Sequence, residues 1–185
     1  VLSGLVTAIT TGEGAVPMSD SLIIALAQTN PTVGAVAANA DLIRQARSDA
    51  AAQGADVVVF SELNLSGYPP EDLVLRSSFL DAIEAVASDL ASDTADGGPA
   101  LVIGAPWRVD GVCYNAALVL DAGEIKGVRL KHHLPNYGVF DEKRVFASGP
   151  PSGPVVVRGV RLGVLVCEDM WFDDVAETVS ESGAE

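Results

Sequence analysis

Basic residues are scarce in this 185-residue sequence, and their shortage argues against two classes of partner. The chain holds 11 lysines and arginines against 25 aspartates and glutamates, which gives a formal net charge of −14 at pH 7. A chain with this excess of negative charge repels a polyanion instead of attracting it. The composition therefore predicts that neither nucleic acid nor an anionic membrane surface is a binding partner.

Cysteine and histidine are also rare. The two cysteines, Cys113 and Cys167, lie in separate apolar stretches without the spacing of a disulfide framework. Free thiols of this kind are typical of a reducing compartment, so we expect a cytoplasmic protein. The two histidines, His132 and His133, are adjacent, and no third ligand stands at a recognisable spacing from them. The sequence therefore predicts no metal site.

Long apolar runs are missing at the start of the chain. The run from Val1 to Ile9 is shorter than the roughly 20 residues that a membrane-spanning helix needs. It also lacks the positive start and the cleavage site of a signal peptide. We expect residues 1–17 to form a disordered extension. Hydrophobic residues make up 49% of the sequence, so residues 18–185 can bury the core of one domain.

Short apolar runs recur along the chain and predict buried strands. Each run is a few residues long and is bounded by turn residues, as expected of a strand inside a sheet. The strands predicted in this way are 22–28, 55–60, 100–107, 154–158 and 160–167.

Helix-like segments separate the first three of these strands. Apolar residues recur at the spacing of one helix face in 35–53 and in 77–93. Two further apolar segments, 112–121 and 124–131, are joined by Ala122-Gly123 and predict an antiparallel hairpin. The order strand, helix, strand, helix, strand indicates the α/β class.

Cys167 stands where the apolar run that begins at Val160 ends. Such a run is typical of a strand covered on both faces, and Glu168 and Asp169 open a polar segment after it. Ligands of layered α/β proteins bind beyond the ends of strands, so Cys167 is a candidate nucleophile. The alternative is that it is an inert, buried, small apolar residue.

Two other polar groups also follow predicted strands: Glu62 after strand 55–60, and Lys131 at the end of the hairpin. A thiol with a reference pKa of about 8.5 is mostly protonated at neutral pH, so it needs a base, which a partly desolvated carboxylate can supply. A lysine ammonium favours the thiolate and the oxyanion that follows its attack on an amide. We therefore interpret Glu62 as the base and Lys131 as the oxyanion partner, although each alone also fits an exposed surface charge.

Three separated motifs resemble the signatures of the nitrilase, or carbon-nitrogen hydrolase, superfamily. They are Phe60-Ser61-Glu62-Leu63, Leu130-Lys131 with Leu134-Pro135-Asn136-Tyr137, and Val166-Cys167-Glu168-Asp169. Two further stretches, 65–73 and 137–144, look like the glutaminase domain of glutamine-dependent NAD⁺ synthetases. The resemblance runs from about Leu22 to the last residue, and Ser61 departs from the proline that many members have.

The resemblance implies a four-layer α-β-β-α sandwich of the nitrilase type and a Glu-Lys-Cys triad that hydrolyses the side-chain amide of glutamine. Glu62 would act as the base and Cys167 as the nucleophile. Lys131, together with the backbone N–H of Glu168, would hold the oxyanion. By the same match, Glu142 resembles a second glutamate that orients the lysine.

The resemblance also implies partners. Tyr137 and Glu168 resemble residues that contact the bound glutamine. In the family, ammonia passes to a synthetase domain that amidates deamido-NAD⁺ to NAD⁺ and is expected to use ATP and Mg²⁺. No cofactor is expected in the glutaminase domain itself, and a homo-oligomer is expected.

The resemblance covers only part of such an enzyme. Residues 18–185 are expected to form the N-terminal part of the glutaminase domain, with the sandwich incomplete and the synthetase domain absent. Two alternatives stay open. In the first, the chain is a stand-alone amidase of the same superfamily that acts on another small amide. In the second, it is a non-catalytic truncated fragment.

Overall fold

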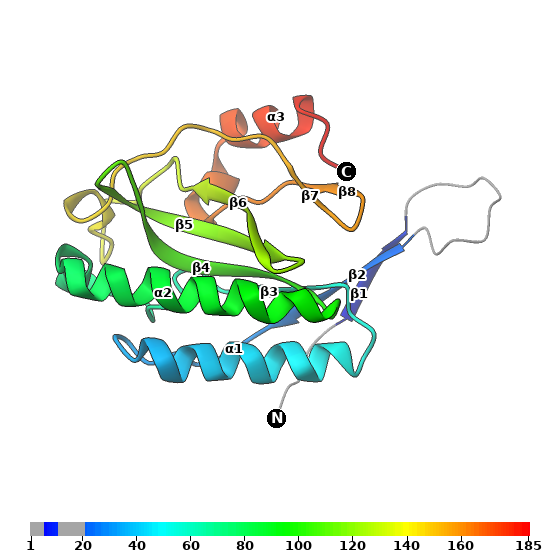
Figure 1. Cartoon of the computed structure of the whole chain (residues 1–185). Helices are drawn as coiled ribbons and strands as arrows, with labels where there is room; N and C mark the ends of the chain where they lie inside the picture. The colour runs from blue at the N-terminus through cyan, green and yellow to red at the C-terminus, as the bar shows by residue number, and fades with distance from the viewer. Residues whose placement is uncertain (1–5, 11–20) are drawn as a thin grey trace.

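A six-stranded sheet runs through the middle of the computed structural model, which describes residues 6–10 and 21–185 (Figure 1). Its strands lie in chain order and are β1 (Val6–Thr10), β2 (Ser21–Ala27), β3 (Val57–Phe60), β4 (Ala100–Val109), β5 (Val112–Asp121) and β6 (Glu124–Leu130). Strands β2, β3 and β4 are parallel, whereas the other neighbouring pairs are antiparallel. A strand-helix-strand-helix-strand unit therefore continues into a hairpin, as the alternation of apolar runs predicted.

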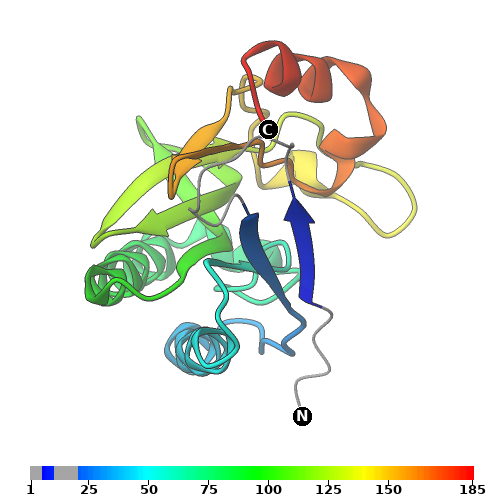
Figure 2. The same ribbon diagram turned by 90° about the vertical axis from the view of Figure 1, so that its right-hand side faces the viewer.

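Two long helices, α1 (Val36–Ala51) and α2 (Ser77–Asp93), cover one face of this sheet. Figure 2 shows both helices nearly end-on, against the same side of the sheet. The fully buried side chains between helices and sheet include Ile43, Ile83, Leu90, Leu101, Ile103 and Leu118. Burial of one such side chain contributes about 1.5–3 kcal/mol, so this core holds the first two layers together. The two predicted helices are confirmed.

A small antiparallel hairpin of β7 (Val155–Val157) and β8 (Val160–Leu162) packs against the other face of the sheet. Helix α3 (Asp173–Glu181) lies on the outer side of this hairpin (Figure 1). Helices, large sheet, small sheet and helix thus follow one another as the α-β-β-α layers of the expected sandwich. Single 3₁₀ turns occupy the connections at Glu71–Leu75, Thr94–Asp96, Glu142–Arg144 and Cys167–Trp171.

The prediction of a long buried strand over 160–167 is wrong. Strand β8 ends at Leu162, and Val164 and Leu165 are only partly buried. Among the described strands β8 pairs with β7 alone. Its other edge meets the last residue of the chain, where the Glu185 N–H donates to the Arg161 carbonyl at 3.0 Å, so no further described strand extends the small sheet there. The chain therefore leaves the small sheet before it reaches Cys167, which begins a 3₁₀ turn.

Strand β1 falls within residues 1–17, the range predicted to be a disordered extension. Its five residues, Val6–Thr10, pair with β2 in antiparallel register. The β-branched residues of this segment suit a strand, and β2 offers it a free sheet edge. Residues 1–5 and 11–17 lie outside the described part of the chain. Within the described part, no helix has the length and apolar character needed to cross a membrane.

Gly104 in β4 lets the segment after β3 pass directly against the sheet. A Cβ atom at this position would lie 2.2 Å from the backbone nitrogen of Leu63 and 2.8 Å from the carbonyl carbon of Glu62. The Gly104 carbonyl also accepts a hydrogen bond from the Leu65 N–H at 2.9 Å. Because Gly104 has no side chain, the backbone at Glu62 and Leu63 can lie directly against β4.

Gly104→Ala should lower the free energy of unfolding by about 3 kcal/mol, because the added methyl group meets backbone atoms that cannot move aside. Gly54→Ala is the matched control. Gly54 has a positive φ of +77° but open space around its Cβ position. Gly54→Ala should therefore lose only the roughly 1 kcal/mol that a left-handed backbone costs a residue with a Cβ atom. Urea unfolding of both variants measures the difference, and equal losses would contradict a tight contact at Gly104.

Candidate active site

The ammonium group of Lys131 lies between two carboxylates at one edge of the large sheet. Lys131 directly follows β6, and its side chain is completely buried. Its Nζ lies 2.6 Å from Oε1 of Glu62, which follows β3, and 2.8 Å from Oε1 of Glu142, in a 3₁₀ turn of the long loop after β6. Folding therefore joins three of the predicted residues in one ion-pair cluster.

Asn115 completes this cluster, and the sequence reasoning missed it. The side chain is fully buried in β5, and its Nδ2 donates to Glu62 Oε1 at 2.7 Å and to Glu142 Oε2 at 3.4 Å. The Asn115 carbonyl accepts the Lys131 N–H at 2.8 Å. One signal was available, because a polar amide just before the apolar run 116–120 must find partners when it is buried.

Opposite charges compensate the buried ammonium of Lys131. Burial on its own would lower the pKa of Lys131, but the charges and hydrogen bonds of Glu62 and Glu142 raise it above the ordinary value. Burial raises the pKa of Glu142, and the ammonium of Lys131 opposes that rise. A lysine ammonium has three N–H groups, and the two carboxylates use two of them. One donor is thus left for a further oxygen.

Cys167 lies beside Glu62 on an exposed turn. Partial burial of the thiol, and then the negative charge of Glu62, raise its pKa above the ordinary value, although the ammonium of Lys131 opposes this rise. The thiol is therefore protonated at neutral pH. Cys167 also has a φ of +48°, a left-handed conformation that costs a non-glycine residue about 1–2 kcal/mol.

Asp169 holds this strained turn in place. Its buried carboxylate accepts the backbone N–H groups of His132 at 3.1 Å and His133 at 2.8 Å through Oδ1. Its Oδ2 accepts the N–H of Val166 at 3.3 Å. One side chain thus ties the residue before Cys167 to the two residues after Lys131, a role that the sequence reasoning did not assign.

Tyr137 and Glu168, the predicted glutamine contacts, meet at the surface next to Cys167. The Tyr137 hydroxyl donates to the Glu168 carboxylate, at 3.0 Å from Oε2 and 3.2 Å from Oε1. Both residues line a groove of about 680 Å³ that also includes Asn136, Lys143 and Ser148. The predicted pair is therefore close together, on a polar surface that an amino acid could occupy.

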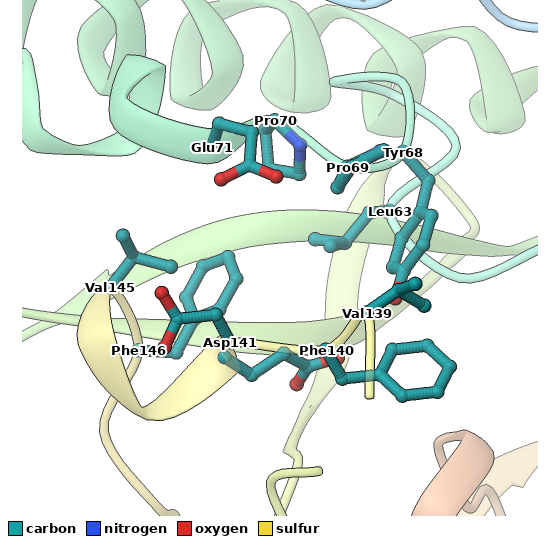
Figure 3. Close-up of a pocket in the computed structure, with 11 residues that line it drawn as sticks. Leu63, Tyr68, Pro69, Pro70, Glu71, Val139, Phe140, Asp141, Val145 and Phe146 are labelled. Carbon is teal, nitrogen blue, oxygen red and sulfur yellow. The ribbon is translucent and has the colours of Figure 1, made fainter. Parts of the chain in front are cut away.

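A second, more apolar cavity of about 280 Å³ lies between the segments that follow β3 and β6 (Figure 3). In Figure 3, Tyr68, Pro69 and Pro70 face Val139 and Phe140 across it. Glu142 also lines it, but Cys167 does not. Burial, and then the charges of Glu62 and Glu142, raise the pKa of Tyr68 to about 12, so its hydroxyl stays a donor near the cluster. Cys167 does not line the groove either, which comes near the thiol through Glu168, the next residue in the chain.

Comparison with known proteins identifies the family of the chain. The family model described as carbon-nitrogen hydrolase matches residues 23–185. The chain is 49% identical over 169 residues to the glutamine-dependent NAD(+) synthetase of Rhodobacter capsulatus, which covers 91% of this chain and 30% of that protein. Identity to the Xylella fastidiosa protein of the same name is 47% over 175 residues, covering 91% of this chain and 31% of that protein. The chain thus spans about 30% of the length of these curated relatives.

Solved structures give the same result. The glutamine-dependent NAD⁺ synthetase from Acinetobacter baumannii, in complex with ADP, superposes with a TM-score of 0.81 at 37% identity, over 88% of this chain and 30% of that one. An amidase mutant from Nesterenkonia, which shows Michael addition of acrylamide at its active site cysteine, superposes with a TM-score of 0.74 at 28% identity, over 88% of this chain and 63% of that one. Because the family match covers most of its length, the chain belongs to the carbon-nitrogen hydrolase family.

Proposed function

We propose that this chain provides the Glu62, Lys131 and Cys167 triad of a glutaminase, which hydrolyses the side-chain amide of glutamine. The observation that carries the proposal is the buried Lys131 ammonium, which is 2.6 Å from Glu62 and has one N–H group left over. The thiol of Cys167 lies next to the same glutamate. This arrangement supplies a nucleophile, a base and an oxyanion donor at one place.

Attack begins with a neutral thiol. Because the pKa of Cys167 is raised, Glu62 takes the S–H proton while the sulfur bonds to the amide carbon. The carbonyl π electrons move to the oxygen, and the resulting oxyanion accepts hydrogen bonds from the third N–H of Lys131 and from the backbone N–H of Glu168. Donors of this kind typically contribute about 10²–10³ in rate.

The tetrahedral intermediate then collapses. The C–N bond breaks as Glu62 returns its proton to the nitrogen, so ammonia leaves and a glutamyl thioester remains on Cys167. Water attacks the thioester carbon as Glu62 takes one of its protons. The C–S bond then breaks while Glu62 returns that proton to the sulfur, so glutamate and the protonated thiol are released. Glu142 and Asn115 act as positioning residues, because they hold Lys131 and Glu62 without contacting the reacting atoms.

Recognition of glutamine is assigned to Tyr137 and Glu168. The Glu168 carboxylate can accept hydrogen bonds from the α-ammonium group of an amino acid, and the Tyr137 hydroxyl orients that carboxylate. Both line the groove beside Cys167, which supports this assignment.

In the whole protein, the ammonia would serve the ATP-dependent amidation of deamido-NAD⁺ to NAD⁺. The names of the relatives, whose sequences extend far beyond the matched part, support this step. ATP and Mg²⁺ belong to the synthetase domain, the partner of this domain within the full-length chain, and assembly into a homo-oligomer is part of the same proposal. Two free cysteines favour the cytoplasm as the site of action.

A stand-alone amidase is the second candidate function. The Nesterenkonia amidase shares the fold, and the chain covers 63% of it instead of 30%. Rates with glutamine and with a simple aliphatic amide such as butyramide separate the two. A clear preference for glutamine favours the glutaminase, equal or faster cleavage of butyramide favours the amidase, and no cleavage of either favours a non-catalytic chain.

Cys167→Ala, made in a protein that joins this chain to a synthetase domain, should abolish glutamine-dependent NAD⁺ formation, a loss of at least about 10³-fold. Synthesis from added ammonium chloride should stay intact, because it bypasses the thiol. Cys113→Ala is the control, since Cys113 lies in β5, where burial raises the pKa of its thiol to about 11. Glutamine-dependent activity that survives Cys167→Ala would overturn the assignment of the nucleophile.

The raised pKa of Cys167 gives a second prediction. The rate at which iodoacetamide alkylates Cys167 should keep rising with pH above about 8.5, the ordinary pKa of a cysteine thiol, because the thiolate is the reactive form. Glu62→Gln should shift this profile to lower pH, because it removes the negative charge that raises the pKa of Cys167. Glu124→Gln, at an exposed ion pair with Lys126 on β6, is the control. A profile that Glu62→Gln leaves unchanged would show that the carboxylate is not beside the thiol.

A further inference from the structure

Three side chains with metal-binding atoms converge next to the groove that Tyr137 and Glu168 line. They are His132 and His133, in the loop after β6, and Asp174, in the first turn of α3. One ligand atom from each lies within 4.8 Å of the others. We infer that these residues form a binding site for a divalent transition metal ion, with Zn²⁺ the metal that suits it best. This inference does not depend on the proposed glutaminase reaction.

His132 presents an unprotonated nitrogen to this site when its ring is neutral. Its Nδ1 lies 2.6 Å from the carbonyl oxygen of Gly149, and a carbonyl can only accept, so Nδ1 carries the proton. In the neutral ring the Nε2 atom then has a free lone pair. It faces Oδ2 of Asp174 at 3.6 Å. Two acceptors that face each other need a cation between them, and a metal ion supplies it.

The second histidine is also held in position. The ring of His133 stacks on Phe172, with centroids 4.0 Å apart and planes inclined by 22°. Its Nε2 lies 2.8 Å from Oδ1 of Asp174. Zinc bonds of about 2.0–2.1 Å place neighbouring tetrahedral ligands about 3.3 Å apart. The separations from Asp174, 2.8 Å from Oδ1 to His133 and 3.6 Å from Oδ2 to His132, lie on either side of this value. Rotation of the side chains would have to bring all three ligand atoms to this spacing from within 4.8 Å of one another.

The chemical nature of the three ligands indicates which metal ion would bind. Two imidazoles and one carboxylate suit Zn²⁺ and related transition metals, whereas Mg²⁺ prefers oxygen ligands alone. Three protein ligands leave one position open for water. The alternative is a metal-free ion pair, in which a second proton on a histidine takes the place of the metal.

The site would connect two segments that hold the candidate nucleophile. The N–H groups of His132 and His133 bond to Asp169, whose other oxygen bonds to the residue before Cys167. Asp174 begins the helix that follows the Cys167 turn. A metal ion would therefore link α3 to the loop after Lys131 and stabilise the Cys167 turn, which precedes α3. The sequence predicted no metal site because Asp174 lies 41 residues from His133, and only folding brings them together.

The test is titration of the chelator-treated chain with ZnCl₂ by isothermal calorimetry, with MgCl₂ as the control for general attraction of cations to a negatively charged chain. One equivalent of Zn²⁺ should bind, Mg²⁺ should not compete, and Zn²⁺ should raise the midpoint of thermal unfolding. His133→Gln and Asp174→Asn should each weaken Zn²⁺ binding by at least about tenfold. Asp173→Asn, an adjacent exposed carboxylate in the same turn, should leave the affinity unchanged.

Three outcomes would overturn the inference. The first is the absence of Zn²⁺ binding by the parent chain, which would leave the metal-free ion pair. The second is equal affinity in Asp173→Asn and Asp174→Asn, which would indicate diffuse charge. The third is binding that His133→Gln preserves but Cys167→Ser abolishes, which would place the metal on the thiol. Asp174→Asn keeps the shape of the side chain, and circular dichroism of the metal-free variant confirms that it folds.

Discussion

The buried ammonium of Lys131 is the constraint on which the rest of the site depends. A charged group without water costs several kcal/mol unless opposite charges and hydrogen bonds compensate it. Here Glu62, Glu142 and Asn115 provide that compensation, and each comes from a different segment of the chain. The sheet therefore has to bring the end of β3, the middle of β5 and the loop after β6 to one point. Loss of either glutamate would leave the buried ammonium with a single carboxylate.

The nucleophile is held in a different way from the lysine. Lys131 is fixed by burial in the edge of a six-stranded sheet, whereas Cys167 stands on an exposed turn with a left-handed backbone. Asp169 links the two regions, because its carboxylate bonds backbone N–H groups on both sides. The rigid cluster thus sets the position of the base, and one buried carboxylate sets the position of the thiol against it.

Substrate choice belongs to the loops above this common centre. The amidases and the synthetases that resemble the chain share its fold, so the sandwich alone does not select glutamine. Tyr137 and Glu168 lie on the polar groove beside the thiol, while Tyr68 and Pro70 line the apolar cavity behind Glu142. The two spaces therefore differ in polarity.

The sequence by itself determined the α/β order of elements and the choice of residues for the proposed triad, because apolar runs of strand length and the three motifs are local patterns. It also determined both long helices, whose apolar spacing is regular. Tertiary structure alone decided the length of β8, since a strand persists only where a neighbour accepts its hydrogen bonds. It alone also revealed Asn115, Asp169 and the approach of Asp174 to the two histidines. Contacts of this kind join residues that are distant in the chain, and their partners follow from packing, not from any local spacing.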